Sequence, residues 1–420
     1  MKEIKDSCIN EFDPNALSVE DALEKILKST KALVDIEHVD LKSSFKRVLS
    51  ENIKSQINVP NYKNSAMDGY AINTRDFDQK NYIFRCVGES FAGSPYTKNV
   101  KLNEAVKVMT GGMIPPGCNA VIMKELVIEN KKTIETRSKI IKNQNIRLIG
   151  EDIRKNQVVL RKGKEIDEID MGILASIGIS NIPVYKRPII GFLSTGDELI
   201  SIKKNIKESQ VYDSNRYLLH GLLKKYSVII KDFGVVKDKI ALIEKKFNEA
   251  ASKCDVLITT GGVSVGDADF VKVVLEKLGK INFWKIAVKP GRPLAYGKIG
   301  NCMFFGLPGN PVSVVVTFNL FVNQAIDKLM GKNYSYPLTI EAELLSDIKK
   351  RKGRKEYKRG VLLKRNNRLF VRKSGAQGSN ILSSLKDANC YIELDENMNQ
   401  AIKGAVVKVL PFTLSSEYYE

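Results

Sequence analysis

The chain has 420 residues, of which 43% are hydrophobic, and its 67 Lys and Arg against 48 Asp and Glu give a net charge of +19. This composition excludes a mainly disordered chain, and the length suits about two to four domains. The first twelve residues lack the apolar core of a secretory signal, and the most apolar segment, residues 311–321, is too short to span a membrane. We therefore expect a soluble, cytoplasmic protein without membrane contact.

Cysteine and histidine are sparse. Six cysteines occur without a C-x-x-C pair, and the only histidines are His38 and His220. This pattern gives neither a disulfide framework nor a thiolate zinc site, and it excludes a site of three imidazoles. Any bound metal would need oxygen ligands, which are typical of Mg²⁺.

The N-terminal part predicts a mixed domain with an insertion. Ser18 is suited to cap a helix, because apolar residues follow it at helical spacing. Over residues 61–143, short apolar runs alternate with Gly, Pro and Asn, which is typical of strands joined by turns. We predict a linker domain of helix and strand over residues 1–60 and 144–183, and a β-rich insertion domain over residues 61–143.

Beyond residue 183 the pattern becomes a regular alternation of strands and helices. Strands are predicted at 189–193, 228–233, 256–259 and 303–305, with helices at 214–226, 239–251 and 268–278 and a last helix that begins at Pro311. Such alternation predicts an α/β domain with a mostly parallel sheet, here over residues 184–332. The strand-rich tail, residues 333–420, predicts a small β-barrel or sandwich.

Three loops follow strands of this sheet, at the edge where ligands of open α/β sheets bind. They are Ser194–Glu198, Thr259–Asp269 and Gly306–Pro311. Small residues allow the backbone to approach a phosphate closely, and helix starts supply N–H donors. Because two of the loops also carry carboxylates, a cation such as Mg²⁺ is expected between them and the phosphate.

Two lysines follow in the segment Trp284–Pro293. Lys285 and Lys289 alternate out of a predicted apolar strand, just before a Gly291 turn. A solvent-facing strand would explain them, but the Lys-Pro-Gly-Arg-Pro turn favours two ammonium groups over the ligand.

The positive charge is concentrated. Residues 349–373 hold thirteen Lys and Arg and one acid, Glu356. A solvated face or a small phosphate ligand is favoured over nucleic acid, because no aromatic stacking pattern accompanies the charge. We expect this stretch to attract an anionic ligand or acidic partner without taking part in catalysis.

Seven motifs of the chain resemble those of the molybdopterin molybdenumtransferases, the molybdenum insertase family that includes the E domain of gephyrin. They cover nearly the whole chain in order: Asn64–Ala71, Met109–Gly117, Ile146–Asp152, Ser194–Glu198, Gly261–Gly266, Lys289–Pro293 and Gly306–Pro311.

The resemblance implies a four-domain homodimer whose α/β domain is similar to the molybdopterin adenylyltransferases. In this family the cleft is completed by the partner subunit's insertion domain, and molybdate is inserted into adenylated molybdopterin with Mg²⁺ and release of AMP. The pterin's own sulfurs hold the molybdenum, which agrees with the sparse Cys and His. Transient contacts with the adenylyltransferase and with apo-molybdoenzymes are also implied.

The resemblance also implies roles for single residues, each at a position of this chain that matches a family motif. Catalytic roles are implied for Asp68, Thr110, Glu198, Asp269, Lys285 and Lys289, with Glu198 and Asp269 as metal ligands. Binding of the nucleotide and pterin is expected of Arg147, Asp152, Ser194, Thr195, Gly196, Asp238, Gly261, Gly262, Ser264, Pro308, Gly309, Asn310 and Pro311.

Three alternatives remain open. The same fold could serve as a non-catalytic scaffold or anion-binding module, as the gephyrin relative suggests, although the acidic loop residues speak against lost catalysis. A nucleic-acid binder would require salt-dependent binding to duplexes of arbitrary sequence. Tungstate could replace molybdate, because the two oxyanions are nearly isosteric.

Overall fold

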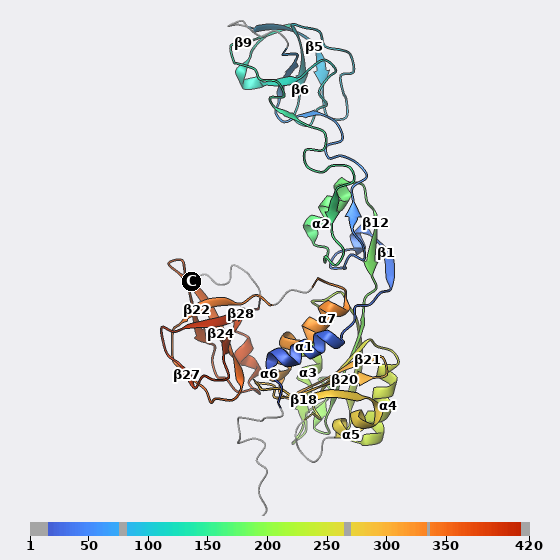
Figure 1. Cartoon of the computed structure of the whole chain (residues 1–420), viewed down its shortest axis with the longest axis vertical. Coiled ribbons are helices and arrows are strands. Elements are labelled where there is room, and N and C mark those ends of the chain that lie inside the picture. The colour runs from blue at the N-terminus through green and yellow to red at the C-terminus, as the bar shows by residue number, and fades with distance from the viewer. Residues whose placement is uncertain (1–15, 75–81, 264–269, 334–336, 413–420) are drawn as a thin grey trace, which may run out of the picture. The chain divides into compact units, whose positions relative to one another are not determined.

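The computed structural model describes residues 16–74, 82–263, 270–333 and 337–412. Two compact units make up the chain (Figure 1). The first contains residues up to 37, residues 46–48 and all residues from 185 onward, and the second contains residues 38–45 and 49–184. Among the described residues, every helix is too short or too polar to cross a membrane.

A six-stranded sheet forms the centre of the first unit. Its strand order is β16-β13-β17-β21-β20-β18, in which the first four strands run parallel and β20 is antiparallel to both of its neighbours, β21 and β18. The strands are β13 (Ile189–Thr195), β16 (Ile229–Val236), β17 (Val256–Thr260), β18 (Lys280–Lys285), β20 (Pro293–Ile299) and β21 (Cys302–Leu307). This arrangement confirms the mostly parallel α/β sheet.

Helices cover both faces of this sheet because its strands are apolar on both sides. Phe192, Ile258 and Phe305 pack in one core, whereas their neighbours in sequence, Leu193, Leu257 and Phe304, pack in another. The first core includes α1 (Val19–Ser29), α3 (Ser214–Leu223), α6 (Pro311–Thr317) and α7 (Asn323–Leu329), and the second includes α4 (Ile240–Ala251) and α5 (Phe270–Leu278). As predicted, Ser18 caps α1 and accepts a hydrogen bond from Asp21 N at 3.0 Å.

The strand order creates a switch point between β13 and β17. The chain leaves β13 toward β16 on one side and leaves β17 toward β21 on the other. Loops that diverge in this way open a crevice at the carboxyl ends of the strands, where open α/β sheets bind ligands.

Residues 280–299 differ from the prediction. We expected Lys285 and Lys289 on one strand, but β18 ends at Lys285, and Val288 and Lys289 form a separate strand, β19. β18 pairs with β20 in the central sheet, whereas β19 pairs with β24 of the C-terminal region. The last helix is also interrupted: a π-helical turn (Phe318–Val322) joins α6 to α7.

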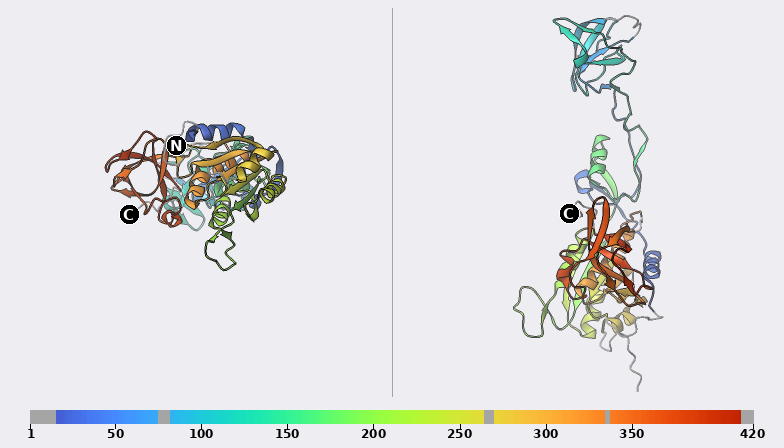
Figure 2. Two further views of the ribbon diagram at one scale, coloured as in Figure 1. Left: turned by 90° about the horizontal axis from the view of Figure 1, so that it is seen from below. Right: turned by 90° about the vertical axis from the view of Figure 1, so that its left-hand side faces the viewer.

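The C-terminal strands close into a five-stranded barrel, which confirms the β-barrel alternative. The order β24-β25-β22-β28-β26 returns to β24 through an additional β24–β26 pairing. The red part of the chain in Figures 1 and 2 is this region. The barrel encloses its own apolar core, which includes Leu362, Val371 and Ile392. Its strands are β22 (Ile340–Leu344), β24 (Lys355–Arg365), β25 (Arg368–Lys373), β26 (Cys390–Leu394) and β28 (Val406–Pro411), with a short pair β23 (Ile348–Lys349) and β27 (Gln400–Ala401).

The second unit is rich in strands. A six-stranded sheet of order β7-β4-β6-β5-β9-β8 lies within residues 69–136. Its strands are β4 (Gly69–Ile72), β5 (Tyr82–Ser90), β6 (Glu104–Val108), β7 (Ala120–Met123), β8 (Ile128–Asn130) and β9 (Thr133–Thr136). The rest of this unit includes α2 (Glu168–Ser176), the pair β2 (Ile53–Lys54) with β11 (Val158–Leu160), and the pair β3 (Asn64–Ser65) with β10 (Ile146–Arg147).

Candidate functional site

A cavity of about 920 Å³ lies at the switch point of the first unit. The loops after β13, β17 and β21 form one wall, and residues of β24 and the loop at 377–379 form another. Eleven predicted site residues line it: Thr195, Gly196, Glu198, Asp238, Gly261, Gly262, Lys289, Pro308, Gly309, Asn310 and Pro311. The three loops that the sequence singled out therefore meet at one place.

Glycine is required where two of these loops touch. Gly261 has φ +85°, and a Cβ there would lie 2.5 Å from the carbonyl oxygen of Thr195. Gly262 has φ +65° and would place a Cβ 2.8 Å from Thr195 Oγ1. Any residue with a side chain would push the two loops apart and strain the backbone. The two glycines therefore allow the loops after β13 and β17 to touch.

Ser194 lies behind the cavity wall. Its hydroxyl donates a hydrogen bond to Asp213 Oδ1 at 3.1 Å and lies 3.0 Å from Thr260 Oγ1. Asp213 caps α3 by accepting from Arg216 N at 3.2 Å, and Asn215 in the first turn donates to the Gly309 carbonyl at 2.6 Å. Ser194 thus helps to fix the start of α3 and does not line the cavity.

Carboxylates gather on one side of the cavity. The Asp238 backbone N–H lies 3.4 Å from Asp197 Oδ1, and burial together with the negative charges of Asp197 and Glu198 raises the pKa of Asp238. Like charges this close favour a proton or a cation between them. These oxygen donors suit Mg²⁺, although within the described residues no three acidic, Cys or His side chains converge into a complete metal site.

Two predicted residues, Ser264 and Asp269, lie outside the described residues. The metal pair of Glu198 with Asp269 therefore stays a prediction. Lys285 also stands apart, because it is half-buried at the end of β18 opposite Pro293 and is absent from the cavity lining.

The C-terminal wall was missed by the sequence reasoning. Arg354, Tyr357, Lys358 and Arg359 line the cavity, together with Gln377, Gly378 and Ser379. Three of them, Arg354, Lys358 and Arg359, are bases of the stretch 349–373, for which the sequence predicts only a long-range attraction of anions. The stretch has far too many bases for charge alone to indicate which of them turn inward.

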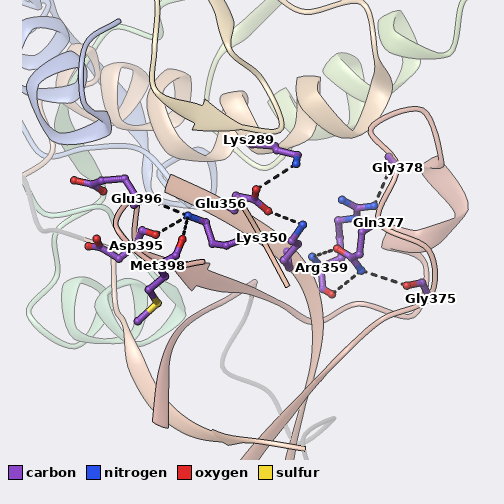
Figure 3. A network of polar contacts seen from close by, with 11 residues as sticks. Lys289, Lys350, Glu356, Arg359, Gly375, Gln377, Gly378, Asp395, Glu396 and Met398 are labelled. Carbon is purple, nitrogen blue, oxygen red and sulfur yellow. Dashed lines mark hydrogen bonds and ion pairs between the residues drawn. The ribbon is translucent and has the colours of Figure 1, made fainter. Parts of the chain in front are cut away.

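Arg359 builds this wall from behind. The residue is 1% exposed, and one guanidinium nitrogen donates to the carbonyls of Ala376 and Gly378 at 3.0 Å each. Figure 3 shows the bond to Gly378. Its Nε donates to Ser384 Oγ at 3.1 Å. Asn310 Nδ2, in the loop after β21, donates to Ser379 Oγ at 3.0 Å. These bonds hold the loop at 376–379 against the α/β domain.

The remaining predicted residues lie in the second unit. Asp68 Oδ1 accepts hydrogen bonds from Thr110 N at 2.7 Å and Thr110 Oγ1 at 2.8 Å, and both bonds lower the pKa of Asp68. Arg147 is exposed and pairs with Asn64 across two short strands, while Asp152 N donates to the Val59 carbonyl at 3.0 Å. The structure brings Asp68 and Thr110 together.

Comparison with known proteins identifies the family. Three family models match, described as the MoeA N-terminal region (domain I and II) at residues 17–178, a probable molybdopterin binding domain at 191–328 and the MoeA C-terminal region (domain IV) at 341–412. A molybdopterin molybdenumtransferase of Haemophilus influenzae is 42% identical over 94% of this chain and 98% of its own length. The chain belongs to the MoeA family. It is thus an enzyme of molybdenum cofactor biosynthesis.

Other MoeA relatives agree. Gephyrin of Dictyostelium discoideum is 34% identical, and the match covers 94% of this chain and 62% of gephyrin. A crystal structure of a molybdopterin biosynthesis MoeA protein from Pyrococcus horikoshii OT3 is 31% identical, covers 94% of this chain and 100% of its own, and superposes with a TM-score of 0.83. The MoeA fold therefore extends over nearly the whole chain.

Proposed function

We propose that the chain inserts molybdate into adenylated molybdopterin and releases AMP, with Mg²⁺ as the assisting cation. The observation that carries this proposal is the convergence of three glycine-rich loops, a group of carboxylates and Lys289 on one cavity. An adenylate requires donors for phosphate oxygens, and a charged anhydride beside carboxylates requires a cation.

The loops would bind the phosphate. Gly261 and Gly262 leave the backbone accessible, and Pro308, Gly309, Asn310 and Pro311 of the third loop line the same cavity. Lys289 also lines this cavity and would add an ammonium group. Together they would orient the adenylate and offset the charge that develops as the anhydride breaks.

Mg²⁺ would be held by Glu198, with Asp238 nearby and Asp269 as the predicted second ligand. Bound there, the ion would supply Lewis-acid stabilisation of the phosphate oxygens. Burial is the main cause of the raised pKa of Asp238, and the negative charges of Asp197 and Glu198 add to it; a cation would relieve this second part.

Molybdenum would be held by the pterin's own sulfurs. None of the five cysteines in the described part of the chain lines the cavity, and burial raises the pKa of Cys118, Cys302 and Cys390 to about 12. These thiols stay protonated at neutral pH and are poor metal ligands. The substrate would thus bring the ligands that the protein does not offer.

We propose further that the enzyme is a homodimer with a site shared between subunits. The Asp68–Thr110 pair lies in the second unit of the chain, whereas the cavity lies in the first. The family's arrangement would bring the pair to the cavity of the partner subunit.

One assay tests the proposed reaction. Purified protein is incubated with adenylated molybdopterin, and AMP is measured with and without molybdate and with and without Mg²⁺. We expect AMP release that depends on both ions and is strongly reduced in Glu198→Gln. Tungstate in a parallel reaction shows which oxyanion is preferred. No AMP release by folded protein with both ions present would contradict the proposal.

A further inference from the structure

A buried carboxylate joins two lysines at the wall of the cavity. Glu356 Oε1 lies 3.2 Å from Lys289 Nζ, and Glu356 Oε2 lies 2.6 Å from Lys358 Nζ (Figure 3). The Glu356 side chain is only 2% exposed. Each oxygen of the carboxylate thus serves a different ammonium group.

The three side chains differ in what they face. Lys289 and Lys358 both line the cavity, whereas Glu356 does not. The Lys289 side chain is 43% exposed and that of Lys358 14%. The carboxylate therefore lies behind the two ammonium groups, and only the positive groups are presented to a ligand.

The backbone fixes this arrangement. β19 and β24 pair in parallel, and their register places Lys289 opposite Glu356 and Val288 opposite Lys355. Lys358 lies two residues beyond Glu356 on β24, so their side chains leave the strand on the same face. The strand pair thereby joins the α/β domain to the barrel at the point where the two lysines meet.

We propose that Glu356 is a positioning residue that holds Lys289 and Lys358 side by side for a tetrahedral oxyanion. Two ammonium groups repel each other, and long lysine side chains lose considerable entropy when they are fixed. A buried carboxylate between them offsets both effects. The three groups retain a net charge of +1, and each ammonium has further N–H donors for the ligand.

The inference rests in part on the proposed function, which supplies two sources for such an oxyanion. One is the phosphate of the adenylate and the other is molybdate. The shared chemistry is a multiply charged tetrahedral anion, and AMP and molybdate serve as separate probes of the two sources.

The experiment measures binding and turnover of Glu356→Gln, which keeps the shape of the side chain and removes its charge. AMP and molybdate are titrated calorimetrically at low ionic strength, and the KM and kcat of AMP release are measured separately. We expect the affinity for at least one probe to fall about tenfold or more, since losing one partner of a buried charge pair is costly. KM should rise more than kcat falls.

Two further variants make the test specific. Glu343→Gln is the matched control, because Glu343 pairs with Arg368 at 2.5 Å on the same barrel and neither residue lines the cavity. Lys358→Gln removes one of the positioned ammonium groups and gives a result even if Glu356→Gln does not fold. Glu356→Gln and Lys358→Gln combined should weaken binding by less than the product of the two single effects, because Glu356 acts through Lys358.

The outcomes are distinct. Weaker anion binding in Glu356→Gln and in Lys358→Gln, with an unchanged Glu343→Gln, supports the positioning role. Unchanged affinity for both probes in Glu356→Gln or in Lys358→Gln, or fully multiplicative effects in the double variant, overturns it. If the parent protein binds either anion but releases no AMP, the proposed function fails while the binding data still decide the role of Glu356.

Discussion

Asp68 and Thr110 are 42 positions apart in sequence, yet one carboxylate oxygen of Asp68 accepts both the backbone N–H and the hydroxyl of Thr110. Thr110 follows β6, whose strand pairs directly with β4, and β4 begins immediately after Asp68. The sheet register therefore brings the two motifs together. A carboxylate with two donors is held in its charged form and in one orientation.

Removing the Thr110 hydroxyl should raise the pKa of Asp68. The pKa of Asp68 lies below the ordinary value of 3.8, chiefly because of the Thr110 N–H and then the hydroxyl. The stability from this interaction is present above the ordinary value and is lost as pH falls through the lowered pKa. Thr110→Ala keeps the N–H donor, so part of the shift should remain. Carbon-13 NMR titration of the carboxyl measures it.

The matched control for this titration is Thr136→Ala. The Thr136 hydroxyl donates to the carbonyl of Leu126 at 2.7 Å, and neither Thr136 nor Leu126 is among the groups that shift the pKa of Asp68. This variant should leave the Asp68 titration unchanged. If Thr110→Ala also leaves the pKa of Asp68 unchanged, the Thr110 hydroxyl does not stabilise the Asp68 carboxylate in solution.

Lys350 should prove to be a structural lysine. Its residue is 8% exposed, and its ammonium group donates to the carbonyls of Asp395, Met398 and Glu396 at 2.7, 3.0 and 3.4 Å (Figure 3). Lys350→Met would leave these carbonyls without their charged donor, and we expect a loss of about 2 kcal/mol in the free energy of unfolding. Urea denaturation measures it. The exposed Lys352→Met should change stability by far less, and equal values would show that the carbonyl contacts contribute nothing.

The exposed side chains of the basic stretch should mainly increase the rate at which an anionic ligand binds. Lys350 and Lys355 are buried in contacts with carbonyls or carboxylates, so their neutralisation would disturb the barrel. Arg351, Lys352 and Arg372 are exposed. Replacing these three with Gln should slow anion association at low salt and leave turnover at saturation nearly unchanged. Stopped-flow measurements at two salt concentrations test this, and a large loss of kcat would place the exposed bases in the site itself.

How far the sequence predicts the site depends on whether local pattern or long-range pairing places each residue. The three loops could be found because glycines and carboxylates follow apolar strands in a recognisable order. The C-terminal wall could not, because it depends on pairing of β19 with β24, which are some 65 residues apart. A strand register of this kind leaves no local signal.

Two single residues show how long-range strand pairing limits prediction from the sequence. Four-residue spacing would place Lys285 and Lys289 on one face of a strand, but the chain leaves the central sheet between them. Glu356 did carry a signal, since it is the single acid among thirteen bases. The structure places this carboxylate between two lysines.

Glu198→Gln should isolate the role of negative charge at the cavity. The substitution keeps the shape of the side chain and removes one carboxylate from beside Asp238. If Glu198 holds Mg²⁺, turnover should fall by about 10²-fold and a higher Mg²⁺ concentration should be needed, a usual scale for lost transition-state charge stabilisation. A parental rate with unchanged Mg²⁺ dependence would place the cation elsewhere. Glu249→Gln, on the surface of α4, is the control for a lost surface carboxylate.

Complementation should reveal whether two subunits build one site. Asp68→Ala disables the second unit and Glu198→Ala disables the first, so each homodimer would have two defective sites. If a site combines Asp68 of one subunit with Glu198 of the other, a mixed dimer contains one intact site and one doubly defective site. Random reassociation of equal amounts gives half mixed dimers, so about one quarter of the parental activity should return after mixing and reassembly. Size-exclusion chromatography and differently tagged subunits verify that mixed dimers have formed. Inactive mixed dimers of folded subunits would show that each site is built within one chain, and a monomeric protein with full activity would exclude sharing altogether.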